Sequence, residues 1–190
     1  MSTLYSVGQM NQLADALEAV GYTPDHITKM RSKPDLLTQF KCVLTGLSEI
    51  VVVKHVIDCD TQPFVPEGLS VEQHAQGGQL EWKPDMVGLY LSEKQKNGGF
   101  IGGNKLRKEL GSRHVLNANV LDYLLANPHL IPEEWKGKYI FFWGTIYRGS
   151  GGDLYVRYLY WGGDRWDWDY CYWLDGDWDD NNPAAVLASS

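Results

Sequence analysis

The 190-residue sequence contains few of the features that mark catalytic or metal-binding proteins. It has no CxxC pair and no HExxH motif, so the common zinc signatures are missing. It also lacks GxSxG and the spacing of a phosphate-binding loop, so no motif indicates an activated nucleophile or a nucleotide site. We therefore expect a protein that is not an enzyme and that carries no resident cofactor.

Cysteines and long apolar runs are also scarce. The three cysteines, Cys42, Cys59 and Cys171, are scattered and odd in number, which argues against a disulfide framework and predicts free thiols. No apolar run approaches the ~20 residues that a membrane-spanning helix needs. Residues 1–20 have neither a charged start nor a continuous apolar stretch, so we expect no secretory signal and a cytoplasmic location.

Basic residues are few where the acidic residues gather. The net charge of the chain is −7, and residues 161–182 hold seven Asp against one Arg, a local charge of −6 that leaves −1 for the remainder. Proteins that bind nucleic acid rely on Lys and Arg contacts with phosphates, and a platform for single strands needs a basic groove beside its aromatic side chains. The charge pattern therefore disfavours nucleic acid as a partner.

Residues 1–47 have the pattern of a small helical region. Ser6 and Gln9 form a capping box before apolar residues at helical spacing, and Gly21 is a natural stop. Pro24 and Pro34 are expected to open two further helices. The third should bury its apolar residues, namely Leu36, Leu37, Phe40, Val43 and Leu44. This region could serve in oligomerisation.

From residue 48 onward the pattern becomes mostly that of strands. Residues 49–57 are a continuous β-branched run, which predicts a strand buried on both faces. A second strand is predicted within residues 80–91, from the alternation of Val87, Leu89 and Leu91. Three final strands are predicted at residues 139–148, 154–161 and 166–174, joined by Gly-rich loops of hairpin length. Short helices are expected from Asn104 and Asn117, and Val186 and Leu187 should form a closing strand. The fold class is therefore α+β, with residues 1–47 as one region and 48–190 as one domain.

The segment 158–182 combines tryptophan, tyrosine and aspartate in a way that neither an ordinary core nor an ordinary loop does. At the period of a strand, one face holds Trp166, Trp168, Tyr170 and Tyr172. The other face holds Asp167, Asp169, Cys171 and Trp173. Aspartate and glycine form β-structure poorly. We infer that something other than folding selects the residues between the tryptophans.

The genetic code suggests what selects them. Changing the adenines of an Asn codon yields Asp, Tyr, Gly, Cys, Arg and similar residues, whereas Trp, Leu, Pro, Ala and Val can be encoded without adenine. Within the segment 155–182, the interspersed positions hold almost only the first set, and Gly162 and Gly163 belong to it too. The candidate ligand-binding residues are Tyr158, Tyr160, Asp164, Arg165, Asp167, Asp169, Cys171, Tyr172, Gly176, Asp177, Asp179, Asp180 and Asn181.

The sequence WDWDYCYWLDGDWDDNNPAAVLAS resembles the variable region of the variable proteins of diversity-generating retroelements. In that family, error-prone copying at adenines rewrites the 3′ end of one gene, and the product displays the changed residues on a C-type lectin fold. The resemblance implies that fold for residues 48–190. It also implies a diversified face that binds an unknown protein or glycan ligand.

Two other interpretations remain open at this point. The first is a fixed carbohydrate-binding module with an aromatic platform, assisted by Ca²⁺ if the alternating Asp175, Asp177, Asp179 and Asn181 bind it. That spacing lacks the Gly and Glu of the helix–loop–helix calcium site. The second is an enzyme in which Asp167 or Asp169 acts as acid or base, although nothing in the sequence positions such a pair against a substrate.

Overall fold

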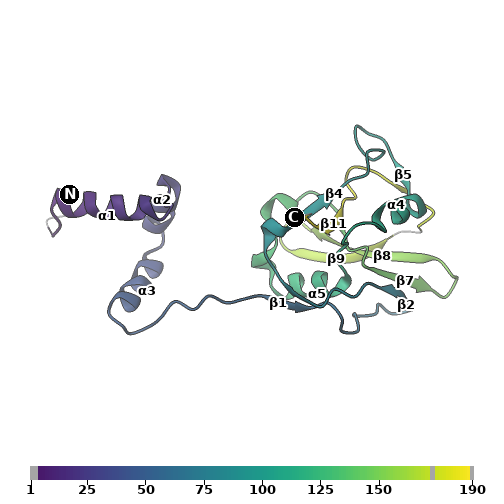
Figure 1. The fold of residues 1–190 in the computed structure, drawn as a ribbon, viewed down its shortest axis with the longest axis horizontal. Coiled ribbons are helices and arrows are strands. Elements are labelled where there is room, and N and C mark those ends of the chain that lie inside the picture. Colours follow the sequence, from purple (N-terminus) through teal and green to yellow (C-terminus); the bar gives the residue numbers. More distant parts are fainter. Residues whose placement is uncertain (1–3, 172–173, 189–190) are drawn as a thin grey trace. The chain divides into compact units, whose positions relative to one another are not determined.

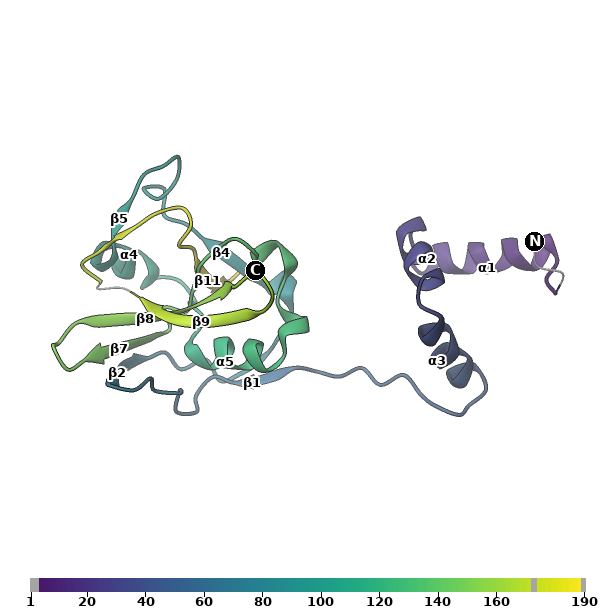
Figure 2. The ribbon, with the colours of Figure 1, turned by 180° about the vertical axis from the view of Figure 1, so that it is seen from behind.

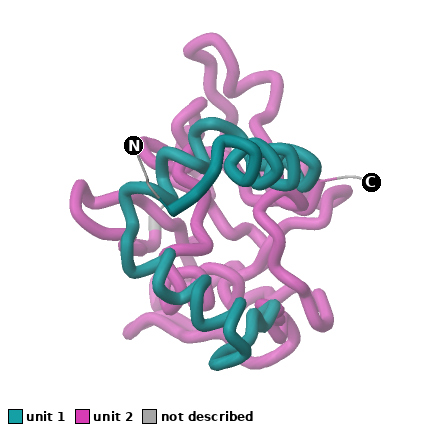
Figure 3. Tube along the Cα trace, turned by 90° about the vertical axis from the view of Figure 1, so that its left-hand side faces the viewer, with its two compact units in different colours: residues 1–53 teal, residues 54–190 magenta. Residues whose placement is uncertain are grey.

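The computed structural model describes residues 4–171 and 174–188 of the chain. It holds five α-helices and a curled β-sheet, so the predicted α+β class is observed. The chain divides into two compact units, residues 1–53 and 54–190 (Figure 3), whereas the sequence analysis placed the boundary after residue 47. Of the candidate site residues, Tyr172 lies outside the described residues, and so does the side chain of Cys171.

Residues 1–53 form three helices, α1 (Val7–Ala19), α2 (Pro24–Arg31) and α3 (Pro34–Leu44). The predicted capping box is present, because the Ser6 hydroxyl accepts from the Gln9 amide and the Gln9 side chain accepts from the Ser6 amide. The expected burial in α3 is wrong. Leu36, Phe40 and Val43 are half-buried, Leu37 and Leu44 are exposed, and no described residue of the three helices is buried. A unit this small buries a low fraction of its surface.

The strand expected at residues 49–57 is also largely wrong. Only its end is a strand, β1 (Val56–Asp58), which pairs with β3 (Gln79–Glu81). The run Ile50–Val53 is exposed, with Val52 at 83%. A β-branched run forms a buried strand only when it can pair and pack with neighbouring strands. In the run 49–57, only Val56 and Ile57 pair with another strand, as part of β1.

The second unit is built on a seven-stranded sheet of order β2-β7-β8-β6-β11-β4, with β9 on the free edge of β8 (Figure 1). Its strands are β2 (Leu69–His74), β4 (Val87–Tyr90), β6 (Ile140–Phe141), β7 (Thr145–Gly149), β8 (Leu154–Trp161), β9 (Trp166–Cys171) and β11 (Ala184–Leu187). Strand β8 is central, because β7 and then β6 pair along one edge of it and β9 along the other. The closing strand predicted at Val186 and Leu187 is confirmed as β11, which runs antiparallel to β4 and parallel to β6.

The single strand predicted at 139–148 is two strands, β6 and β7, separated by a turn. Gly144 lies in this turn against the backbone of Asn117, and a Cβ on Gly144 would approach Asn117 atoms to 2.9 Å. The turn sends β6 and β7 to different stretches of β8. As a result, Phe141 becomes the partner of Tyr158, and Tyr147 that of Tyr155.

Helices cover the two faces of this sheet, as both views show (Figures 1 and 2). Helix α5 (Ala118–Ala126) packs Val120, Leu121 and Leu124 into one apolar cluster with Leu159 of β8. Helix α4 (Gly103–Leu110) packs Leu106 and Leu110 into a second cluster on the other face. A small sheet of β5 (Ile101–Gly102) and β10 (Asp177–Trp178) closes this second cluster, and short 3₁₀ turns occupy Pro84–Met86, Pro128–Leu130 and Glu133–Trp135.

Candidate ligand-binding site

The pairing register of β8 and β9 sorts the residues of the hairpin onto two faces. Residues directly opposite each other in an antiparallel pair share a face, and Tyr158 lies opposite Asp169 while Tyr160 lies opposite Asp167. We call these four residues the front face. The back face consists of the alternate residues, namely Arg157, Leu159, Trp161, Trp166, Trp168 and Tyr170. The alternation predicted for residues 166–171 is therefore observed.

A buried arginine fixes the back face. Arg157 is 1% exposed, and its Nη1 and Nη2 donate to the two carboxylate oxygens of Asp122 in α5, at 3.0 and 2.7 Å. The guanidinium also lies 4.0 Å from the ring centroid of Trp168 and 5.1 Å from that of Phe64. A bidentate ion pair fixes the guanidinium in its plane, and the rings of Trp168 and Phe64 pack against it. The hairpin is thereby locked onto α5.

Apolar packing completes the back face. Leu159 is fully buried, and Trp166, at 9% exposure, lies with its ring centroid 5.5 Å from that of Trp161. Lys136 covers the outer side of Trp161, with Nζ 4.0 Å from the ring centroid. The tryptophans of the hairpin that the structure describes therefore face the α5 side of the sheet.

The front face presents a group of tyrosine rings instead. Tyr139, which precedes β6, brings its ring centroid to 5.6 Å from that of Tyr158 and 6.2 Å from that of Tyr160. The centroids of Tyr158 and Tyr160 are 5.7 Å apart. Tyr158 and Tyr160 are half-buried and Tyr139 is exposed, so all three rings pack side by side and remain accessible.

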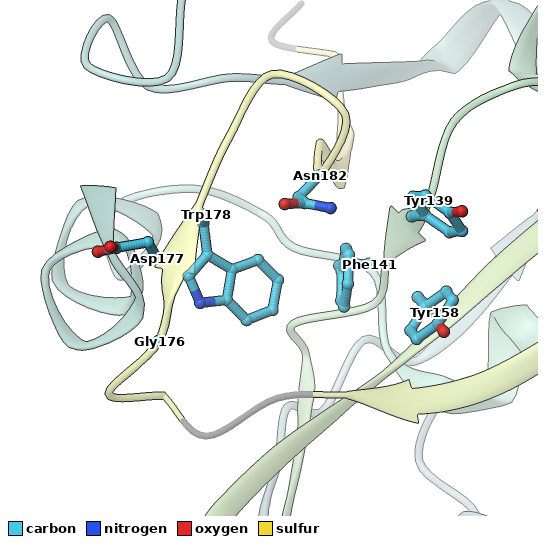
Figure 4. Close-up of a pocket in the computed structure, with 7 residues that line it drawn as sticks. All are labelled: Tyr139, Phe141, Tyr158, Gly176, Asp177, Trp178 and Asn182. Carbon is cyan, nitrogen blue, oxygen red and sulfur yellow. The ribbon is translucent and has the colours of Figure 1, made fainter. Parts of the chain in front are cut away.

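A cavity of about 540 Å³ lies beside these rings (Figure 4). Phe141 and Trp178 stand together in it with ring centroids 4.4 Å apart, while Tyr139 and Tyr158 stand on the far side of Phe141. Its lining consists of Tyr139, Phe141, Tyr158, Gly176, Asp177, Trp178 and Asn182. Most of this wall is aromatic, and its size is within the range of small-ligand sites. The cavity and the front face share Tyr158 and are therefore continuous.

The start of α4 holds the loop that forms one wall of the cavity. The Gly103 amide donates to the Gly176 carbonyl at 3.0 Å, and the Asn104 amide donates to the Leu174 carbonyl at 2.8 Å. Asn104 Nδ2 also donates to Asp175 Oδ1 at 2.6 Å. The loop after β9 therefore accepts hydrogen bonds from the donors at the start of α4.

A buried glutamine holds the other end of this loop. Gln95 is 0% exposed, and its Nε2 donates to the carbonyls of Asp179 and Asn182, at 2.7 and 3.2 Å. Its Oε1 accepts from the Ser92 amide at 2.9 Å. Within the loop, the Asp179 amide donates to Asn182 Oδ1 at 3.1 Å. Both ends of residues 174–182 are therefore anchored to the segment that carries β5 and α4.

The candidate site residues with described side chains lie at the surface, and none of them is buried. Tyr158, Tyr160, Asp167 and Gly176 are half-buried. The others are exposed, namely Asp164, Arg165, Asp169, Asp177, Asp179, Asp180 and Asn181. By contrast, the residues that need no adenine are buried or half-buried, namely Leu159, Trp161, Trp166, Trp168, Leu174, Trp178, Pro183, Ala184, Ala185, Val186 and Leu187.

The sequence analysis missed part of this site. Tyr139 and Phe141 were assigned to a strand without a role, and Asn182 was left outside the candidate set. Their places depend on the pairing of β6 with β8, which skips β7 in the chain. The alternation of Tyr139 and Phe141 was the available signal, because it places both rings on one face.

Across residues 4–171 and 174–188, no group of three or more His, Cys, Asp or Glu side chains is placed to hold a metal ion. Cys59 is buried, and desolvation, with smaller contributions from Asp60 and Asp58, raises the pKa of its thiol to about 11. That thiol therefore stays protonated at neutral pH and is a poor metal ligand.

No family model matches this chain, and neither a curated protein nor a solved structure was found to be similar to it. Within the described ranges, none of the helices is both long and apolar enough to cross a membrane. The residues and geometry of the site are therefore the basis for inferring its function.

Proposed function

We propose that residues 54–190 form a ligand-binding domain of the C-type lectin-like kind. Its front face and the adjoining loop would be diversified by adenine-directed copying from a retroelement. The domain binds its ligand and does not transform it. The ligand is a protein or a glycan that contacts the tyrosine rings, the cavity beside them and the surrounding aspartates.

One observation carries this proposal. In residues 158–187, the described Asp, Tyr, Gly, Arg and Asn residues lie at the surface, fully exposed or half-buried, and the described Trp, Leu, Pro, Ala and Val residues, which can be encoded without adenine, form the buried support. Mutagenesis restricted to adenines would then change contact residues and spare the residues that hold the domain together. Surface substitutions away from special features usually alter stability by less than ~0.5 kcal/mol, so such a face can vary without unfolding the domain.

The DNA around the gene provides the decisive test. We expect a near-copy of the stretch encoding residues 155–182 that differs from it only at adenines, with a reverse transcriptase gene nearby. Sequencing the flanking DNA checks this. If the flanking DNA lacks either feature, the proposal that this face is diversified is wrong.

A library supplies a second test that needs no genome. The candidate codons would be replaced by Asn codons randomised at their adenines, and a control library would randomise as many of the tryptophan, leucine, valine and alanine positions. We expect most members of the first library to give soluble, cooperatively unfolding protein, and few of the second. Equal fractions of folded members would contradict the division into support and contact residues.

A fixed carbohydrate-binding module is the second candidate, and the grouped rings of Tyr139, Tyr158 and Tyr160 favour it. Sugars stack on such rings, and the cavity of about 540 Å³ accommodates one sugar unit. This candidate predicts one defined glycan as ligand, and its binding is lost after EDTA treatment if Ca²⁺ assists it. Calorimetry across a glycan panel distinguishes it from a diversified face.

A further inference from the structure

The exposed apolar side chains of the chain gather in residues 1–53. Fourteen of the 21 large apolar residues that the described part of the chain exposes lie there. Helices α1 to α3 span residues 7–44, a length at which a segment usually needs disulfides, a metal or association to fold. Cys42 is a free thiol, and no metal-binding group occurs among residues 4–171 and 174–188. Of these three means, association remains.

Helix α1 carries an apolar stripe along one side. Met10, Leu13 and Leu17 follow one another at the three- and four-residue spacing of a single helix face. Met10 and Leu13 are 50% and 51% exposed, and Leu17 is half-buried. A helix of this kind binds by laying its apolar stripe into a groove of a partner.

The same unit contains a groove that suits such a stripe. A cavity of about 370 Å³ begins where α1 ends, and Val20, Tyr22, Met30 and Leu36 give it apolar walls, with Lys29 and Lys33 beside them. Val20 is 72% exposed, and the other three apolar residues are half-buried. Lys29 is paired with Asp25 at 2.7 Å, so Lys33 gives the groove its positive charge. The groove therefore suits an apolar helix that carries an acidic residue.

Two charges of this unit lie at helix ends that disfavour them. Glu18 is in the last turn of α1, which holds no basic residue, and the helix dipole is negative there. Lys33 is the N-cap of α3, where the dipole is positive. Among the residues that the structure describes, neither side chain forms a salt bridge. Each would gain from a charge of the opposite sign, and each is the charge that the other lacks.

We propose that residues 7–44 bind the same residues of a second copy of this chain in a two-fold dimer. Helix α1 of each copy lays Met10 and Leu13 into the groove of the other, and Glu18 pairs with the partner's Lys33. The chain supplies both the stripe and the groove, so one self-complementary surface is used twice, as two-fold symmetry requires. The dimer does not depend on the ligand-binding function proposed above. If both hold, the dimer carries two binding faces and gains affinity for a repeated ligand.

The first test is sedimentation equilibrium of the full chain, from about 1 to about 200 μM, where we expect a monomer–dimer equilibrium. Leu13→Gln should weaken the dimer about tenfold or more, because it removes a buried apolar contact twice in each dimer. Val65→Gln, which removes an exposed apolar side chain of the second unit, is the control and should alter the dimer Kd less than about twofold. A chain that stays monomeric throughout, or that forms trimers or larger assemblies, overturns the proposal.

A charge exchange then locates the contact. Glu18→Lys and Lys33→Glu each place like charges together and should weaken the dimer about tenfold, whereas the double variant restores the pair with reversed signs and should recover most of the affinity. Both substitutions give a helix end the charge that its dipole favours, so poorer helix ends cannot cause a weaker dimer. Glu67→Lys, an equal reversal at an exposed residue of the second unit, is the matched control.

The outcomes of the charge exchange are distinct. A double variant that associates no better than the weaker single variant shows that Glu18 and Lys33 do not meet, and this overturns the proposed arrangement. An equal loss for Glu67→Lys and Glu18→Lys shows a general charge effect and overturns it too. Neither measurement uses a ligand or the flanking DNA, so failure of the dimer leaves the proposed ligand-binding function untouched.

Discussion

The front and back faces of the β8–β9 hairpin are made by the same two strands, yet their residues do different work. On the back face, each described residue from Arg157 to Trp168 contacts another part of the domain, through the Asp122 pair, the α5 cluster or ring stacking. On the front face, Tyr158 and Tyr160 pack beside Tyr139, while Asp167 and Asp169 accept hydrogen bonds from residues one or two positions away in the sequence. Stability and surface chemistry are thus assigned to alternate residues of one hairpin.

This comparison shows how a small domain can separate folding from recognition. Because side chains alternate along a strand, a residue can change on one face without altering the packing of its neighbours on the other. This separation requires that the back face fix the pairing register of β8 and β9 independently of the front-face residues. The Arg157–Asp122 pair and the packed tryptophans fix that register.

The largest expected effect is on the back face. Trp166→Ala should lower the free energy of unfolding by about 3–5 kcal/mol, because it removes a buried indole and leaves a cavity beside Trp161. Urea unfolding measures the loss. A loss no greater than that for Asp167→Asn, one position along the strand, would end the distinction between the faces.

Arg157→Ala should cost about 3 kcal/mol, because it leaves Asp122 without its partner. We expect the lower end of the range for broken buried pairs, since Asp122 is a third exposed and water can reach it. The double variant Arg157→Ala with Asp122→Ala should recover part of the loss in the same assay. If the double variant is less stable by the sum of the single losses, the two side chains are not coupled.

Gln95→Ala tests the loop 174–182, which forms one wall of the cavity. It removes three hydrogen bonds of a buried side chain, so we expect a loss of about 2 kcal/mol. Hydrogen exchange should accelerate most in residues 174–182, and the exposed Gln62→Ala serves as the matched control. Uniform acceleration over the whole domain would show that Gln95 supports the fold in general and not this loop.

The smallest effects belong to the front face. Asp167→Asn and Asp169→Ser should each change the free energy of unfolding by no more than ~0.5 kcal/mol. The salt bridge of Asp167 with Arg165, at 3.2 Å, joins two accessible side chains and adds little. Thermal unfolding of both variants checks this. A loss comparable to that of Trp166→Ala would make the front face structural.

The sequence was most informative where local physics decides. The capping box at Ser6, the strand at residues 154–161 and the alternation of residues 166–171 depend on near neighbours, and all three are observed. Residues 49–53 were misassigned, because a β-branched run needs a neighbouring strand that the sequence does not reveal. The strand expected at 166–174 is observed as β9, Trp166–Cys171, and residues 172 and 173 lie outside the described part of the chain.

The candidate site was predictable only in part, for a similar reason. Its aspartates and tyrosines follow from composition and alternation. Its cavity depends on β6 pairing with β8, a non-local choice made by the turn at Gly144. The burial of Arg157 could not be foreseen either, because a charged residue in a strand usually faces water unless a partner such as Asp122 is present.

The anchors of the loop 174–182 grip mainly its backbone. Gln95, Gly103 and Asn104 donate to main-chain carbonyls, which every amino acid possesses. The two loop side chains that do take part in anchoring, Asp175 and Asn182, both fall outside the positions predicted to vary. Residues outside the loop therefore largely determine its backbone conformation. Its exposed side chains can be replaced without loss of the hydrogen bonds that hold this conformation.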